Sequence, residues 1–194
     1  MTTFYISDTH AYHQNILQFE PGRTHYESVE EMNEDLIDKW NSVVSKNDTV
    51  YHLGDVSFGG KERLREFLDR LNGKIILLKG NHDHTKDLKY VHDLLQDIRD
   101  FHSFKTHGYR LLLCHYPVDI GLRKKMFNIH GHIHSHKSRL YNQVNVGVDA
   151  LLPKYLSDDT IGRPVAEEEL IKWVQSIEKV IDEDNGYSRY SLYK

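Results

Sequence analysis

Cysteine is almost absent from this sequence, since Cys114 is the single cysteine in 194 residues. An internal disulfide is therefore excluded, and a reducing compartment is indicated. No apolar run approaches the roughly 20 residues that a membrane span requires. The opening MTTFYISDTH also lacks the charged start and apolar run of a secretion signal. We therefore expect a cytoplasmic protein without a membrane partner.

Excess positive charge is also missing. The formal net charge is −4 with neutral histidines, so no general basic surface of the kind that binds long nucleic acid is indicated. The composition, 39% hydrophobic and 28% charged, is that of an ordinary globular chain. We expect residues 1–194 to form one domain, with 182–194 either a weakly ordered tail or a segment that packs through its tyrosines. Nothing in the sequence indicates the oligomeric state.

Short β-rich runs alternate with amphipathic helical patterns, which favours an α/β fold. Strands are expected at residues 2–7, 48–54, 74–80, 109–115, 127–131 and 142–148. Helices are expected after the capping box of Ser28 and Glu31, and at residues 61–71, 87–97 and about 166–181. No internal repeat or linker interrupts this alternation.

Side chains that can bind a metal follow the expected strands. They are Asp8 and His10, Asp55, Asn81 with His82, and His115. Because ligand sites of open α/β sheets gather at the carboxyl ends of strands, we expect these groups to lie together. The segment NIHGHIHSH at 128–136 adds four histidines at alternate positions, which share one face of an extended segment.

Each of these residues has a simpler interpretation when it is taken alone. His115 would be typical of a satisfied core or surface histidine, Asp55 of a turn, and Asn81 of a turn or cap. Together they indicate metal ligation, and a mixture of Asp, Asn and His without thiolate favours Mn²⁺, Fe or Zn²⁺. Within the histidine segment, His130 and His136 either support the ligands or are merely exposed.

In chain order the motifs are D-x-H at 8–10, G-D at 54–55, G-N-H-D at 80–83, His115, and G-H-x-H at 131–134. With these motifs the sequence resembles the calcineurin-like metallophosphoesterase superfamily over residues 8–134. SDTH and NVGVDAL also resemble the small bacterial and phage members. The resemblance implies a four-layer α-β-β-α sandwich, in which helices flank two mixed β-sheets.

The resemblance also implies two divalent metal ions per chain, with Mn favoured and Fe, Zn or Ni as alternatives. The implied ligands are Asp8, His10 and His134 for the first ion, Asn81, His115 and His132 for the second, and Asp55 as the bridge. The implied reaction is hydrolysis of a phosphodiester, or of an unactivated phosphomonoester, by a hydroxide that bridges the metals. In the family pattern His82 protonates the departing alkoxide and Asp83 orients His82. The expected substrate is a small phosphoester such as a nucleotide.

Cationic residues outside the motifs are candidates for substrate contact. Arg23 follows the first motif closely. The run Arg123, Lys124 and Lys125 either contacts an anionic substrate or is a solvated charged turn.

Two other classes of protein remain open. A metal-binding or scaffold protein with the same fold and little turnover would typically lack a ligand or the acid, and none of these residues is missing here. A nucleic-acid-processing subunit usually has extra domains or a basic face, and the sequence shows neither.

Overall fold

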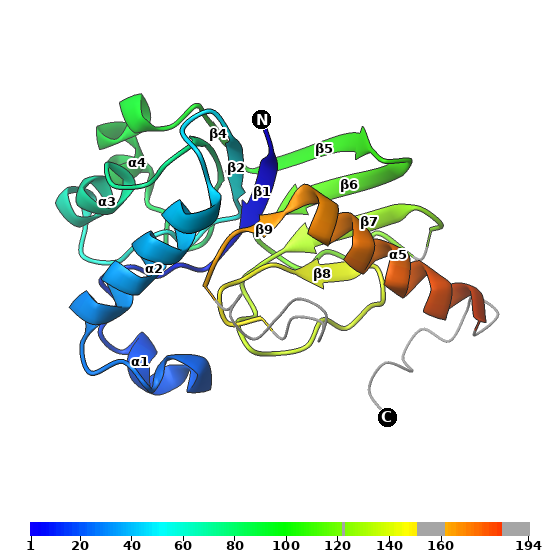
Figure 1. Cartoon of the computed structure of the whole chain (residues 1–194), viewed down its shortest axis with the longest axis horizontal. Helices are drawn as coiled ribbons and strands as arrows, with labels where there is room; N and C mark the ends of the chain where they lie inside the picture. Colours follow the sequence, from blue (N-terminus) through cyan, green and yellow to red (C-terminus); the bar gives the residue numbers. More distant parts are fainter. Residues whose placement is uncertain (122, 151–161, 184–194) are drawn as a thin grey trace.

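Four parallel strands and one antiparallel edge strand form the first sheet. The computed structural model describes residues 1–121, 123–150 and 162–183 (Figure 1). The order of the five strands is β4-β3-β2-β1-β9. Their bounds are β1 (Thr3–Ile6), β2 (Thr49–His52), β3 (Lys74–Leu78), β4 (Asp97–Arg99) and β9 (Val165–Ala166). Because β1, β2 and β3 run parallel, their carboxyl ends lie at the same edge of the sheet.

A second sheet has four strands in the order β5-β6-β7-β8. Their bounds are β5 (Phe101–Thr106), β6 (Tyr109–Cys114), β7 (Met126–His130) and β8 (Gln143–Asn145). β5 is antiparallel to β6, and the other pairs are parallel. An isolated bridge pairs Ser7, after β1, with Gly147, after β8. This bridge joins the two sheets at the carboxyl ends of their strands.

The helices connect and flank these sheets. Their bounds are α1 (Ile16–Phe19), α2 (Val29–Val43), α3 (Lys61–Leu68), α4 (Thr85–Tyr90) and α5 (Glu167–Glu183), with 3₁₀ turns η1 (Pro21–Arg23) and η2 (His92–Leu94). Ser28 caps α2 by accepting a hydrogen bond from the Glu31 N–H over 3.1 Å. Met32, Leu36 and Trp40 form its buried stripe.

Two hydrophobic clusters form the core. In the first, side chains of α2, α3 and α4 pack against strand residues such as Ile6, Val50 and Leu77. The second lies between the sheets, where Tyr5 and Leu78 meet side chains of β6 and β7, and it includes residues of α5. Figure 1 shows α5 running across the second sheet. Glu167 on α5 ties the two sheets together, because it accepts hydrogen bonds from Tyr5 and Thr106.

The predicted α/β fold with two mixed sheets flanked by helices is confirmed. The helix expected at 87–97 is wrong in extent: α4 ends at Tyr90, η2 follows, and β4 begins at Asp97. Pairing with β3 ends the helical pattern. The Ile75 carbonyl of β3 accepts a hydrogen bond from the Gln96 N–H, and Ile76 of β3 pairs with Asp97 of β4. Within the described residues no helix is both long and apolar enough to cross a membrane. The tail from residue 184 onward lies outside the described residues, and the single domain stays a prediction.

Candidate metal centre

Sharp turns after β1, β2 and β7 place most of the predicted ligands. Five of these ligands have a positive φ, which non-glycine residues rarely adopt. The angles are 57° at Asp8, 47° at His10, 58° at Asp55, 72° at His132 and 47° at His134. Each such residue costs on the order of 1–3 kcal/mol and persists only where its surroundings impose it. Backbone strain is therefore concentrated at the candidate site.

The motif glycines let these turns approach one another. A Cβ atom at Gly80 would lie 2.2 Å from Asp55 Oδ1, and one at Gly131 would lie 2.2 Å from Asp8 Oδ2. At Gly54, where φ is +99°, a Cβ would lie 2.5 Å from the Gly80 nitrogen. No side chain fits at such distances, so only glycine permits the close packing of the loops.

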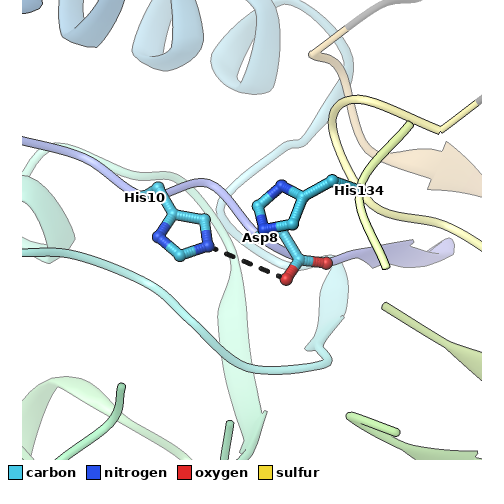
Figure 2. A group of neighbouring side chains, drawn as sticks. All are labelled: Asp8, His10 and His134. Carbon is cyan, nitrogen blue, oxygen red and sulfur yellow. Dashed lines mark ion pairs between the residues drawn. The ribbon is translucent and has the colours of Figure 1, made fainter. Parts of the chain in front are cut away.

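A first group of candidate ligands joins the loop after β1 to the loop after β7. Asp8, His10 and His134 each place one ligand atom within 4.8 Å of the others. Figure 2 shows both imidazoles close to the Asp8 carboxylate, and His10 Nε2 lies 3.9 Å from Asp8 Oδ1. These three residues are the set predicted for the first metal ion, and the structure brings them together.

A second group centres on Asp55 and His115. Asp55 Oδ2 lies 3.4 Å from His115 Nε2 and 3.6 Å from His10 Nε2, so it stands between the two groups. His115 Nε2 is also 3.0 Å from Asn81 Oδ1 and 3.2 Å from His132 Nδ1. All seven predicted ligands therefore gather in one place, and Asp55 has the position that a bridging carboxylate needs.

Unsatisfied donor atoms show that the cluster fits a metal. Both ring nitrogens of His10 are buried without a hydrogen-bond partner, although the side chain is only 2% exposed. A buried polar atom without a partner costs about 1–3 kcal/mol, and a bound cation would remove that cost for the ring nitrogen that carries the lone pair. Burial lowers the pKa of His10 to about 2, so its ring is neutral and a nitrogen lone pair is available. Burial also raises the pKa of Asp8 to about 6, a shift that a nearby cation opposes.

Comparison with known proteins accords with this geometry. Residues 1–180 match the model of the Metallophos family, the calcineurin-like phosphoesterases. The chain belongs to the calcineurin-like phosphoesterase family. It is therefore a metal-dependent hydrolase of phosphoric esters, from a family that uses two metal ions, and the described residues include groups suited to hold them.

Several proteins are similar to this chain in sequence or in structure. The uncharacterized protein MJ1445 of Methanocaldococcus jannaschii is 31% identical over 184 residues, which cover 90% of this chain and 97% of the relative. The gene 66 protein of Mycobacterium phage L5 is 36% identical over 84 residues, or 42% of this chain and 39% of that protein. The crystal structure of AQ665, a protein of unknown function from Aquifex aeolicus, covers 88% of this chain and 98% of its own, with a TM-score of 0.65 and 26% identity.

Hydrogen bonds behind the phosphoesterase site orient its imidazoles. His134 Nδ1 lies 3.0 Å from Asp149 Oδ2, and His115 Nδ1 lies 2.8 Å from the Leu53 carbonyl. Donation through Nδ1 leaves Nε2 of each ring as the ligand atom, an arrangement typical of metal-binding histidines. Asn145 donates to the His134 carbonyl over 2.8 Å and so supports the same turn.

The expected general acid lies at the edge of the cluster. The backbone N–H of His82 donates to Asp55 Oδ1 over 2.9 Å. The His82 ring is exposed, and its centroid lies 4.7 Å from that of the Phe58 ring. Asp83 differs from expectation, because its carboxylate accepts from the N–H groups of Gly80, Asp55 and Val56 over 2.8–3.1 Å. It makes no hydrogen bond to the His82 ring among the described residues. Asp83 therefore joins two motif loops instead of orienting the imidazole.

The predicted substrate cations are either buried in hydrogen bonds or separated from the candidate ligands by the length of β7. Arg23 is 2% exposed, and its guanidinium donates to Asp149 and to the carbonyls of Asp8 and Thr9. These bonds make Arg23 a support for the first motif. The run 123–125 is exposed but immediately precedes β7, at the opposite end of that strand from His132 and His134. Its location favours the solvated turn over substrate contact.

Two residues near the cluster have little or no signal in the sequence. Glu20 Oε1 lies 3.8 Å from His134 Nδ1, and Glu20 with His134 and Asp149 forms a third group of possible ligand atoms. Tyr116 packs edge-on against His132, with 4.7 Å between the ring centroids. Both belong to loops whose path depends on tertiary structure. The one local clue is that Tyr116 directly follows the ligand candidate His115.

Proposed function

We propose that the chain hydrolyses phosphodiesters with two divalent cations, for which Mn²⁺ is the first candidate and Fe, Zn or Ni are alternatives. The observation that supports this most directly is the position of Asp55 Oδ2, within 3.6 Å of His10 Nε2 and 3.4 Å of His115 Nε2. One carboxylate oxygen thus faces an imidazole from each proposed ligand set. The proposed ligands are Asp8, His10, Asp55, Asn81, His115, His132 and His134. When bound, the two cations would activate a water molecule as the nucleophile and neutralise charge on the phosphate oxygens.

His82 is the proposed general acid. Its backbone is tied to Asp55, while its ring is exposed beside a cavity of about 220 Å³ that Phe58 and Gly60 also line. A proton from that ring would go to the leaving oxygen, which departs as an alcohol. General acid catalysis typically contributes about 10²–10⁴-fold, and an alkoxide leaving group needs it most.

Two separate cavities support a diester rather than a monoester. One includes His82 and Phe58, and the other, of about 570 Å³, includes His132 and His134. Within the described part of the chain the two cavities share no lining residue. A phosphodiester has two organic substituents, so one can occupy each cavity, whereas a monoester has only one.

The test is an activity screen on full-length protein reconstituted with Mn²⁺. We expect bis-p-nitrophenyl phosphate to be hydrolysed far faster than p-nitrophenyl phosphate, with about two ions bound per chain. Asp55→Ala should remove both the activity and most of the metal. Faster hydrolysis of the monoester would contradict the diester assignment. Two bound ions without turnover of either ester would favour the metal-binding or scaffold alternative.

The setting of this activity is also a proposal. A single cysteine favours a reducing environment, so we propose that the protein acts in the cytoplasm, as one domain, on a small phosphoester such as a nucleotide.

A further inference from the structure

The larger cavity has cations on its wall. Its lining includes Lys137, Arg139 and His136 together with the proposed ligands His132 and His134. Glu20 is its one carboxylate among the residues that the structure describes, and it lies beside His134. Arg139 is exposed and makes no ion pair with any residue that the structure describes. The cavity therefore offers a guanidinium to an anion a short way from the proposed metal ions.

Hydrogen bonds to buried residues hold the loop that bears Lys137 and Arg139. His130 is fully buried, and its Nε2 lies 2.9 Å from the hydroxyl of Ser138, the residue between Lys137 and Arg139. The other ring nitrogen bonds the Gly131 carbonyl, and the Leu140 N–H donates to Gln143 Oε1 over 3.1 Å. A guanidinium on an anchored loop loses less conformational entropy when it binds an anion, so this loop is suited to recognition.

We propose that Arg139, assisted by Lys137, binds a second phosphate of the substrate, one nucleoside away from the phosphate that is cleaved. This inference rests on the proposed function, because it assumes that the scissile phosphate lies on the metal cluster and the leaving group beside His82. The retained substituent then enters the larger cavity. Its volume of about 570 Å³ falls in the range of small-molecule sites, about 300–1,000 Å³. Pro117 and Ile133 give it an apolar wall for a sugar or base.

The test compares two chromogenic diesters that release the same nitrophenolate. They are thymidine 5′-(p-nitrophenyl phosphate) and the same compound with a phosphate on the 3′-oxygen. We expect the Mn²⁺-loaded protein to prefer the 3′-phosphorylated ester in kcat/KM by about tenfold or more, as a charge-assisted hydrogen bond predicts. High salt should reduce this preference, because the proposed ion pair between Arg139 and the 3′-phosphate is exposed to solvent.

Variants locate the preference. Arg139→Gln should abolish most of the preference and Lys137→Gln part of it. Arg110→Gln should leave kcat/KM unchanged for both esters. Arg110 is exposed near the start of β6, whereas His115 follows the end of that strand, so this control removes the same charge far from the cavity. Thymidine 3′,5′-bisphosphate should inhibit the wild type more strongly than thymidine 5′-phosphate, and Arg139→Gln should equalise the two.

The outcomes separate this inference from the proposed function. A wild type that hydrolyses both diesters equally well would overturn the phosphate subsite and leave the phosphodiesterase intact. A preference that survives in Arg139→Gln would also overturn it. Failure of the loaded wild type to hydrolyse bis-p-nitrophenyl phosphate would instead contradict the proposed function itself.

Discussion

Arg23 and Asp149 form a buried bidentate ion pair, with Nε 2.7 Å from Oδ1 and Nη2 2.8 Å from Oδ2. The same guanidinium donates to the carbonyls of Asp8 and Thr9, and the same carboxylate faces His134 Nδ1. The pair therefore connects the first motif to the last one through a continuous set of hydrogen bonds. Its position explains how turns of unfavourable φ are held in place.

We predict that Arg23→Met lowers the free energy of unfolding by about 3–5 kcal/mol, because it removes the guanidinium partner of the buried Asp149 carboxylate. Urea unfolding of the metal-free protein measures this. Arg63→Met is the matched control, since Arg63 forms an exposed pair with Glu66 and should change stability by less than about 1 kcal/mol. If Arg23→Met left the urea midpoint unchanged and raised KM, Arg23 would instead contact the substrate.

Asp149→Asn should weaken metal binding by about 10–100-fold, because His134 loses the carboxylate that orients its ring. Isothermal titration calorimetry with Mn²⁺ measures the affinity. Asp38→Asn, an exposed change on α2, should leave the affinity at the wild-type value. Equal affinities for Asp149→Asn and wild type would show that the contact with His134 has no part in the metal site.

Gly80→Ala should remove bound metal and activity together, because the new methyl group would overlap Asp55 Oδ1. Gly22→Ala adds the same methyl group where nothing lies within 4 Å, so it should be silent. Metal analysis and circular dichroism of both variants distinguish loss of the site from loss of the fold. A Gly80→Ala protein with its full metal content would mean that the loops can separate without harm.

His82→Ala should lower kcat on a dinucleotide by about 10²–10⁴-fold and much less on a nitrophenyl diester, since nitrophenolate leaves without a proton. The metal content should stay near wild type, because the His82 ring is exposed at the edge of the cluster. Losses of equal size on the two substrates, or a missing metal ion, would assign His82 a ligand or structural role.

Asp83→Asn should behave differently from His82→Ala. Its carboxylate accepts three backbone N–H groups from the loops of Asp55 and Gly80, and an amide reproduces these bonds poorly. We therefore expect reduced metal affinity and similar losses on both substrates, measured with the same pair of esters. A loss confined to the dinucleotide would instead support orientation of His82 by Asp83.

The sequence predicted the strands near the site well because their apolar runs end at chemically distinctive residues. Asp8, Asp55 and Asn81 follow strands whose pairing makes their ends adjacent. The sequence did not predict β5, because its pattern is mostly polar and Phe101 at its start is exposed.

Tertiary effects account for what could not be predicted. The burial of Arg23 depends on Asp149, 126 residues away, so no local pattern reveals it. The distance of the basic run from the site depends on β7, which separates Lys125 from His132. The positive φ angles of Asp8 and His134 also cannot be predicted from residue type, since Asp and His adopt positive φ more often than most residues but still only rarely.

The origin of the ligand candidates in both sheets has a consequence for biosynthesis. The backbone N–H of His132 donates to Asp8, 124 residues earlier in the chain. While the ribosome is still translating the second sheet, the emerging chain holds Asp8 and Asp55 but not the histidines that complete either proposed ion site. Contacts between residues so distant in sequence are slow to form, because the long loop between them must close first. Neither proposed ion site can therefore be complete until synthesis has passed His132 and His134 and both sheets can pack together.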